Sequence, residues 1–265
     1  MKKTDTLKEI IQKKREKILL AKQQLPEEDL KARLQNISPA RPFIETINKP
    51  RAISLIAEIK KASPSRGVIR QDFILQEIAR IYQEAGAVAI SVLTEEDFFQ
   101  GNIAYLSEIK PVVDLPLLRK DFILEPYQVY ESRYFGADAV LLIADLLSAQ
   151  KLSELISLAD TLGLDCLVEV HTEKELKKVL NLKKLVNFMI GINNRDLHTL
   201  EVDFKITEKL FPLIPKDRVV VVESGIKSYQ DVLFLKILGA SAVLIGEAFM
   251  EAEDLKKKVE EVMGW

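Results

Sequence analysis

Short apolar runs recur along most of the chain, and each has the length of one β-strand. They are nearly continuous in Val, Ile, Leu and Ala instead of alternating with polar residues, which is typical of strands covered on both faces. The runs are residues 55–60, 88–93, 116–120, 139–144, 166–170, 188–193, 219–223 and 242–246. The pattern therefore predicts eight buried strands.

Helical patterns separate these runs. Leu152, Leu155 and Ile156 recur at three- and four-residue spacing, which places them on one face of a helix. Ser148 and Ser228 stand at the start of two such stretches. Serine is a favoured N-cap because its side-chain oxygen accepts a hydrogen bond from an early backbone N–H of the helix. We therefore expect strands and helices to alternate along the chain.

A weak internal repeat supports this alternation. Gly86, Gly136 and Gly239 each end a helical stretch, and an apolar strand follows within two or three residues. Glycine readily adopts the left-handed conformation that ends a helix, so the chain returns directly to the sheet. Strict β–α alternation repeated eight times closes most simply as an α/β fold of the (β/α)8 TIM-barrel type. A doubly wound open sheet is the alternative, but the first strand lacks the Gly-x-Gly-x-x-Gly turn of dinucleotide-binding sheets.

The first 50 residues do not follow the alternation. Leu7, Ile10 and Ile18 lie on one side of a predicted helix whose remaining positions include several basic residues. We interpret it as a solvated helix packed across one end of the barrel. The chain is thus predicted to be a single barrel domain, residues 1–265, with residues 1–50 as an N-terminal helical extension.

Composition narrows the class of protein. The chain has 265 residues, of which 48% are hydrophobic and 29% charged, with a net charge of −2. This near-neutral balance gives no electrostatic footprint for nucleic acid, and no apolar run approaches the roughly 18 residues of a membrane helix. No signal-peptide pattern opens the chain, and Cys166 is its one cysteine. We therefore expect a cytoplasmic protein without disulfides.

Polar side chains stand repeatedly where the predicted strands end. In a barrel these ends meet at one face, where the active sites of such enzymes lie. Several charges desolvated together are costly, so a purely structural ion-pair network is the less favoured interpretation. Lysines and glutamates in a partly dry cavity shift one another's pKa and supply both a proton donor and an acceptor. The residues concerned are Glu58, Lys60, Lys120, Glu169, Asn193, Arg195 and Glu223.

Two glycine-containing turns indicate a phosphate site. The seventh predicted strand runs into Ser224 and Gly225, and the eighth into Gly246 and Glu247. The loops after strands 7 and 8 form the recurrent phosphate site of this fold. Glycine there lets backbone N–H groups approach phosphate oxygens closely. We therefore expect a phosphorylated small-molecule ligand.

Metal and nucleophile chemistry are poorly supported. His171 and His198 are the two histidines, and they do not form a ligand-spaced pair. The three glutamates at strand ends have the chemistry to hold a divalent cation, but the lysines between them argue against it. Cys166 lies too early in its strand to be a nucleophile, so we assign it to the core. We predict neither a metal nor a cofactor.

These strand ends stand within longer recognisable stretches. They are IAEIKKASPSRG (56–67), SVLTEEDFFQG (91–101), LPLLRKDFILEPYQV (115–129), GADAVLLIADLL (136–147), LVEVHTEKEL (167–176), IGINNRDL (190–197), VVESGI (221–226) and LIGEAFM (244–250). Together they resemble the indole-3-glycerol phosphate synthase family of tryptophan biosynthesis, and the first stretch is the most specific. The resemblance covers the barrel from about residue 53 to 250.

The resemblance implies a lyase reaction that needs no metal and no cofactor. The substrate is 1-(2-carboxyphenylamino)-1-deoxyribulose 5-phosphate, which loses CO2 and water to give indole-3-glycerol phosphate. Lys120 matches the general acid of the family, and Glu169 matches its partner in the proton transfers of dehydration. Glu58 and Lys60 match the first-strand pair, which holds and orients the anionic groups of the substrate. Arg66 departs from the family pattern, because many members have lysine there.

The remaining site residues follow from the same likeness. Asn193 and Glu223 complete the catalytic set. For Glu247 the resemblance implies a phosphate contact through the backbone N–H, because a carboxylate side chain repels phosphate. The residues implied to bind the substrate are Ser63, Phe99, Phe122, Arg195 and Ser224, and those implied to bind phosphate are Gly225, Gly246 and Glu247.

Two other functions stay open at this point. One is a Schiff-base aldolase with Lys120 or Lys60 as the nucleophile. The other is a non-catalytic protein that binds a phosphorylated ligand, although such a binder has no need of paired acid and base groups. In either case we expect a monomer without nucleic-acid or membrane partners.

Overall fold

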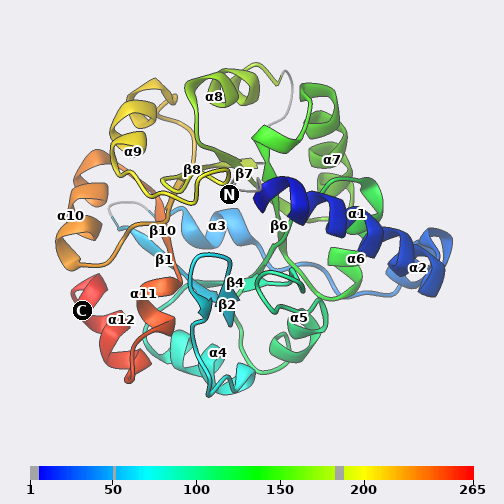
Figure 1. The fold of residues 1–265 in the computed structure, drawn as a ribbon, viewed down its shortest axis with the longest axis horizontal. Helices are drawn as coiled ribbons and strands as arrows, with labels where there is room; N and C mark the ends of the chain where they lie inside the picture. Colours follow the sequence, from blue (N-terminus) through cyan, green and yellow to red (C-terminus); the bar gives the residue numbers. More distant parts are fainter. Residues whose placement is uncertain (1–5, 50–51, 183–187) are drawn as a thin grey trace, which may run out of the picture.

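A closed barrel of parallel strands forms the centre of the molecule (Figure 1). The computed structural model describes residues 6–49, 52–182 and 188–265, and over these residues eight strands pair in the order β1-β10-β9-β8-β7-β6-β5-β4, with β4 closing on β1. The strands are β1 (Ser54–Ile59), β4 (Ala89–Leu93), β5 (Leu117–Lys120), β6 (Ala139–Ile143), β7 (Asp165–Val170), β8 (Phe188–Asn193), β9 (Val220–Glu223) and β10 (Ala242–Ile245). Each lies within one residue of its predicted run, so the barrel is confirmed and the open sheet is wrong.

Helices surround the barrel, as the alternation predicts (Figure 1). They are α4 (Leu75–Glu84), α5 (Ala104–Ile109), α6 (Pro126–Tyr134), α7 (Ala149–Thr161), α8 (Glu173–Leu180), α9 (Lys205–Leu210), α10 (Tyr229–Leu238), α11 (Glu247–Met250) and α12 (Leu255–Met263), with 3-10 helices η1 (Ala144–Leu146) and η2 (Phe211–Leu213). Ser148 and Ser228 cap α7 and α10, and both N-cap predictions are confirmed. Gly86 and Gly239 take φ values of +89° and +106° after α4 and α10, which allows the immediate return to a strand.

Two apolar cores share the strands. In β1, Leu55, Ala57 and Ile59 pack outward against the helices, whereas Ile56 packs inside the barrel. Successive side chains of a strand point to opposite faces, so Glu58 continues the inner face of Ile56 toward the carboxyl end of the strand. The inner core therefore stops where the charged residues begin.

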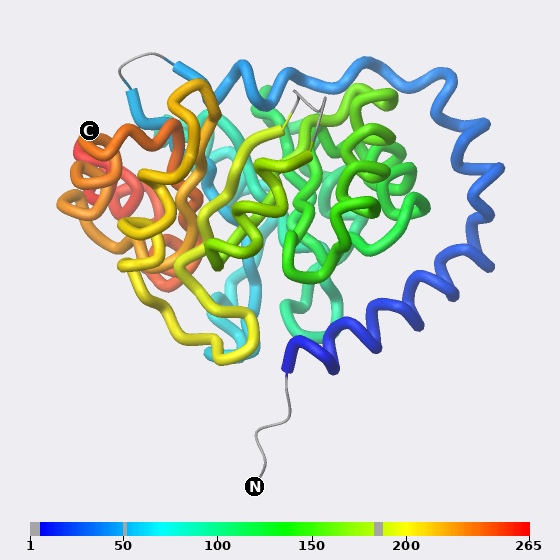
Figure 2. The backbone as a smooth tube through the Cα atoms, turned by 90° about the horizontal axis from the view of Figure 1, so that it is seen from above, coloured from blue at the N-terminus to red at the C-terminus, as the bar shows by residue number. Residues whose placement is uncertain are grey.

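The N-terminal extension contacts both ends of the barrel, although only its first helix was predicted to pack across one of them. It comprises α1 (Thr6–Gln24), α2 (Glu27–Leu34) and α3 (Phe43–Ile47). Figure 2 shows it running along one side of the molecule from one barrel end to the other. Phe43 and Ile47 join the inner core at the end where the strands begin. There the Asp165 carboxylate at the start of β7 accepts hydrogen bonds from the first amides of α3. Residues 1–5 and 50 of the predicted extension lie outside the described residues.

Helix α1 lies at the opposite end, where the strands finish. Leu7, Ile10 and Ile18 are buried, as their spacing predicts. Lys14 is buried as well, with only 3% of its surface exposed, although the sequence pattern placed it on a solvated face. Its ammonium pairs with carboxylates of two barrel loops, which explains the burial.

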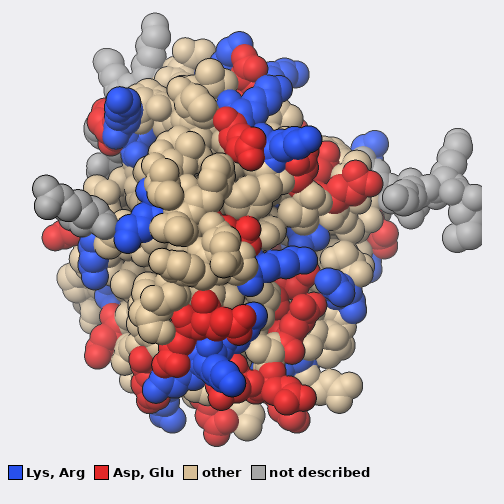
Figure 3. Space-filling model, turned by 90° about the vertical axis from the view of Figure 1, so that its left-hand side faces the viewer, with Lys and Arg blue, Asp and Glu red and all other residues tan. Residues whose placement is uncertain are grey.

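One outer face of the barrel carries exposed apolar side chains. Figure 3 shows a broad area without charged groups on the side of the molecule that includes α10. Tyr229, Leu233, Phe234 and Ile237 of this helix are exposed, and Ile237 is the most exposed of them at 78%. Within the described ranges, every helix is too short or too polar to cross a membrane.

Candidate active site

A cavity of about 630 Å³ opens at the carboxyl ends of the strands. The structure brings all the sequence-predicted site residues to its lining except Ser63, which is buried beside it in the short hairpin of β2 (Ala62–Ser63) and β3 (Gly67–Val68). The hairpin instead presents Ser65 and Arg66 to the cavity. The predicted residues in the lining are Glu58, Lys60, Phe99, Lys120, Phe122, Glu169, Asn193, Arg195, Glu223, Ser224, Gly225, Gly246 and Glu247.

Lys120 lies at the centre of the charged wall. Its Nζ is 3.0 Å from Glu169 Oε2 and 3.2 Å from Glu223 Oε2. Burial alone disfavours the ammonium, but Glu169, Glu223 and then Glu58 outweigh this effect and raise the pKa of Lys120 well above its ordinary value. Lys120 therefore holds its proton at neutral pH and is suited to donate it.

Glu58 forms the second charged contact of the wall. The Lys60 ammonium donates to Glu58 Oε1 at 2.8 Å. Burial favours the neutral acid, but Lys60, Lys120 and Arg195 hold the pKa of Glu58 below its usual range. A Cβ at Gly246 would lie 2.5 Å from Glu58 Oε1, so this glycine leaves room for the carboxylate. We found this steric role only in the structure, because the sequence indicated only approach of a phosphate.

Glu223 differs from Glu58 in its hydrogen bonding. Among the described residues neither of its carboxylate oxygens accepts a hydrogen bond, although Lys120 lies within ion-pair distance. Burial, with a contribution from the Glu169 charge, raises the pKa of Glu223 to about 8 against the opposing effect of Lys120. Glu223 therefore takes up a proton more readily than Glu58 does.

The glycine turns after β9 and β10 border one end of the cavity. Ser224 and Gly225 have φ values of +64° and +83°, which turn the chain sharply at the end of β9. The Glu247 carboxylate is paired with two arginines, since it accepts from Arg195 Nη2 at 3.0 Å and lies 3.5 Å from Arg66 Nη2. This arrangement keeps the negative charge of Glu247 neutralised beside the predicted phosphate turns.

Aromatic side chains line another part of the cavity. The rings of Phe99 and Phe122 are 6.3 Å apart between centroids and tilted by 42°. Leu141 and Ile143 of β6 also line the cavity, and their period-two spacing on a strand was a signal that the sequence interpretation did not use. Val202 and Phe204 line it from the loop after β8, where the sequence has no regular period.

The two histidines and the cysteine lie outside this lining. His171 Nδ1 is 2.8 Å from the backbone oxygen of Asn193, so the ring buttresses the end of β8. Cys166 is fully buried in β7, and burial raises the pKa of its thiol, which agrees with its assignment to the core. In the part of the chain that the structure describes, no group of three or more His, Cys, Asp or Glu residues is placed to hold a metal ion.

Sequence comparison decides the family. A family model described as indole-3-glycerol phosphate synthase matches residues 7–262. The chain belongs to the indole-3-glycerol phosphate synthase family. A relative of that name from Acetivibrio thermocellus is 55% identical over 209 residues, 79% of each chain. Another from Desulforamulus reducens is 47% identical over 258 residues, 97% of this chain and 96% of the relative.

Solved structures support the fold. The chain of 3-hexulose-6-phosphate synthase from Salmonella typhimurium aligns with a TM-score of 0.64 at 15% identity, over 80% of this chain and 97% of that one. A chain of the tryptophan synthase complex from Pyrococcus furiosus aligns with a TM-score of 0.59 at 17% identity, over 80% and 98%. The synthase family assignment, in contrast, makes the protein a decarboxylating carbon–carbon lyase of tryptophan biosynthesis that acts on a phosphorylated small molecule.

Proposed function

We propose that the protein closes the indole ring by proton transfers centred on Lys120. The observation that carries this proposal is the position of the Lys120 ammonium between Glu169 and Glu223, at 3.0 and 3.2 Å. A protonated lysine beside carboxylates joins a donor to its acceptors at one point of the cavity. The substrate of the family has a ketone oxygen that can accept a proton at this point of the cavity.

The two ends of the cavity suit the two ends of this substrate. Its phosphate binds at Gly225 and Gly246, which line the cavity after β9 and β10. Its benzoate ring packs against Phe99 and Phe122, and the ring carboxylate pairs with Lys60. Arg195, Ser224 and Asn193 complete the polar lining. In this pose the ribulose carbonyl lies between the anchored ends, beside Lys120.

The reaction then needs three balanced steps. Lys120 protonates the ketone oxygen as the ring carbon that bears the carboxylate attacks the ketone carbon, which forms the new carbon–carbon bond. The carboxylate leaves as CO2, and its bonding electrons restore the aromatic ring. Lys120 takes up a proton from solvent and gives it to the new hydroxyl, which leaves as water, while Glu169 removes a proton from the adjacent methylene carbon. The proton on Glu169 then returns to Lys120, which restores both groups for the next turnover. The product is indole-3-glycerol phosphate.

The charges of the site argue against the Schiff-base alternative. A nucleophilic lysine must lose its proton, and active sites achieve this by lowering its pKa. The carboxylates around Lys120 raise its pKa instead. If the alternative were correct, borohydride with the sugar phosphate substrate would trap a covalent adduct on Lys120 or Lys60. A stable adduct found by mass analysis would overturn the proposed role of Lys120.

The direct test is an assay with the carboxyphenylamino ribulose phosphate that follows indole fluorescence. We expect turnover by the wild type and a loss of at least about a hundredfold in kcat for Glu169→Gln, since a positioned base typically contributes 10²–10⁴-fold. Glu175→Gln is the matched control, because that buried glutamate caps α8 away from the cavity. Equal kcat for the two variants would contradict the role of Glu169.

We also propose that the protein works as a cytoplasmic monomer of one domain. The predicted site residues, all from one chain, lie in or beside one cavity, which supports a self-sufficient protomer. The reduced and buried Cys166 suits a reducing compartment. Light scattering over a range of protein concentrations is expected to give about 30 kDa, the mass of one chain. A dimer that Ile237→Lys dissociates would instead assign the exposed face of α10 to self-association.

A further inference from the structure

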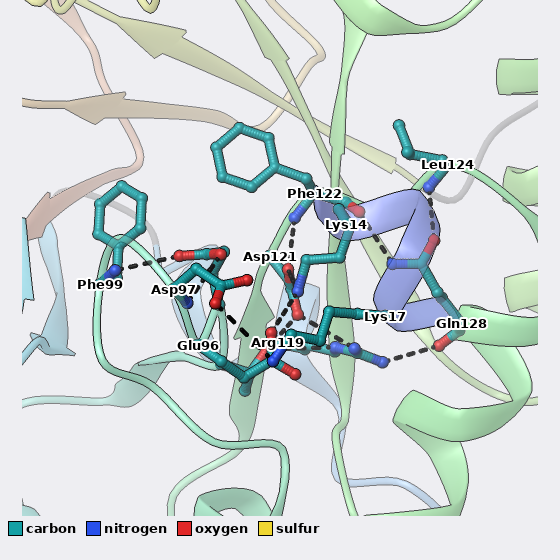
Figure 4. Close-up of polar contacts among 12 residues, drawn as sticks. Lys14, Lys17, Glu96, Asp97, Phe99, Arg119, Asp121, Phe122, Leu124 and Gln128 are labelled. Atoms are coloured by element: carbon teal, nitrogen blue, oxygen red, sulfur yellow. Dashed lines mark hydrogen bonds and ion pairs between the residues drawn. The ribbon is translucent and has the colours of Figure 1, made fainter. Parts of the chain in front are cut away.

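Among the described lysines of α1, Lys14 is the one whose side chain is buried, and it is surrounded by charged groups. Its side chain is 3% exposed, and its Nζ lies 2.9 Å from both Glu96 Oε2 and Asp121 Oδ1. Figure 4 shows the side chain reaching from the helix toward these two carboxylates. A buried ammonium is costly unless it is paired, so the two carboxylates determine where α1 docks.

The two carboxylates belong to different barrel loops. Glu96 lies in the loop that follows β4, and Asp121 follows directly after β5. Burial disfavours the charge of Lys14, but Asp121 and Glu96 more than compensate and raise its pKa above the ordinary value. Lys14 is thus a permanent positive link between the two loops.

Each of these loops carries one phenylalanine of the cavity lining, Phe99 or Phe122. The Phe122 amide donates to Asp121 Oδ1 at 2.8 Å, the same oxygen that contacts Lys14. The Phe99 amide donates to Glu95 Oε2 at 3.0 Å, within the turn that contains Glu96. The backbone of Phe122 is therefore linked to Lys14 through the Asp121 carboxylate. The backbone of Phe99 is linked to Lys14 through the turn that contains Glu96.

Neighbouring residues of α1 contact the same turn. Lys13 Nζ lies 5.0 Å above the centre of the Phe98 ring, and Lys17 Nζ is 3.8 Å from Asp97. Lys17 is 43% exposed, so its contribution is screened by water. The buried contact of Lys14 is the one that is able to fix the spacing of the loops.

We propose that Lys14 is a positioning residue that holds Phe99 and Phe122 together in the wall of the cavity. It does not touch the substrate. Its effect reaches the substrate through the two loops, and the inference rests on the proposed placement of the benzoate ring against these phenylalanines. The N-terminal helix is then a functional part of the site as well as a cover for the barrel.

The test compares Lys14→Met with Lys17→Met. Methionine keeps the apolar length of lysine and removes the charge, so the loops of Phe99 and Phe122 should loosen while Lys120 stays in place. We expect KM for the carboxyphenylamino ribulose phosphate to rise about tenfold, with kcat changed by less than about threefold. Lys17→Met should leave both constants within about twofold of the wild type. Lys14→Arg, which keeps the charge, should recover most of the KM.

A double-mutant cycle with Phe99→Leu separates positioning from a general loss of stability. If Lys14 acts by positioning these phenylalanines, Lys14→Met adds little to the KM of Phe99→Leu. Additive effects, or an unchanged KM in folded Lys14→Met, would overturn the inference. Wild-type turnover and the loss of kcat in a Lys120 variant test the reaction itself, so failure of the proposed function is distinguishable.

A second variant covers the case in which Lys14→Met does not fold. Glu96→Gln removes only the link to the loop of Phe99 and leaves Lys14 paired with Asp121. We expect KM to rise about threefold without a matching fall in kcat. A KM equal to that of the wild type would contradict the inference.

Discussion

Two clusters of charge stand side by side at the end of β5, and they behave differently. We call Lys120, Glu58, Glu169 and Glu223 the inner cluster, because they line the cavity. We call Lys14, Arg119, Asp121 and Glu131 the outer cluster, because their ion pairs join β5 and the loop after it to helices α1 and α6. Both clusters are buried, and both combine cations with carboxylates.

The outer cluster is fully paired. Asp121 Oδ2 accepts from Thr94 at 2.6 Å and from Arg119 at 3.1 Å, while Oδ1 contacts Lys14 at 2.9 Å. Against the cost of burial, Lys14 and Arg119 hold the pKa of Asp121 far below its usual range. Its proton is lost at any ordinary pH, so the cluster serves to hold structure.

The inner cluster is not fully paired. Lys120 is shared by several carboxylates, and Glu223 has no hydrogen bond among the described residues. Its pKa is raised to about 8 by burial, so its protonation changes close to working pH. The end of β5 thus contributes both to a permanently charged cluster that holds structure and to a cluster that can exchange protons. The difference comes from the hydrogen-bond partners that each face of the strand meets.

The largest expected effect is on the inner cluster. Lys120→Ala removes the proton donor, so kcat should fall by at least roughly a thousandfold, about 4 kcal/mol of transition-state stabilisation. The fold and the binding of product should persist, because the cavity already tolerates an uneven balance of charge. Steady-state kinetics and a fluorescence titration with indole-3-glycerol phosphate check this. Unchanged turnover would remove Lys120 from the mechanism.

The next effect should be on the stability of the outer cluster. Arg119→Met leaves Glu131 without its buried cation and Asp121 with Lys14 alone, and breaking such a network costs roughly 3–5 kcal/mol. Urea denaturation measures this loss, while kcat of the folded variant should stay within about tenfold of the wild type. A loss of kcat as large as that of Lys120→Ala would erase the distinction between the two clusters.

A smaller effect concerns the pH dependence of stability. An unfolded glutamate has a pKa of about 4.3, so the folded state binds the extra proton of Glu223 between that pH and about 8. Stability from this group is therefore present at low pH and lost as the pH rises through the window. Relative to the wild type, Glu223→Gln should gain at least about 1 kcal/mol between pH 5 and pH 9. Parallel stability curves would contradict the raised pKa.

The smallest expected effect is on a surface ion pair, against which the cost of breaking the buried outer cluster can be compared. Lys258 and Glu261 form a 3.0 Å ion pair on the surface of α12. Lys258→Ala should change the free energy of unfolding by less than about 0.5 kcal/mol, because water screens the pair. A loss similar to that of Arg119→Met would mean that burial is not what separates the outer cluster from ordinary surface pairs.

The barrel was predictable because its strands and helices follow local periods. Glu58, Lys120 and Glu223 could be placed at the mouth because strand ends in this fold meet at one face. The outer cluster was missed because the burial of Lys14 depends on Asp121, which lies more than a hundred residues later in the chain. No local pattern separates a lysine that reaches solvent from one that reaches a distant carboxylate.

The roles of the glycines show the same limit. The sequence indicated Gly246 as a residue near phosphate, yet in the structure it also makes room for the Glu58 carboxylate. Gly191 does the same for Glu223, since a Cβ there would lie 2.5 Å from Oε1, and no sequence motif indicates this. Close approaches between neighbouring strands depend on register, which is known only after the barrel has closed.

The Asp165 cap of α3 has a consequence for how the chain reaches its native state. The amides of Phe43 and Ile44 find this acceptor about 120 residues later in the sequence. During synthesis α3 leaves the ribosome long before Asp165, and this acceptor is missing until β7 has been made. The amides of α3 therefore stay without this partner until more than half of the barrel strands have been synthesised.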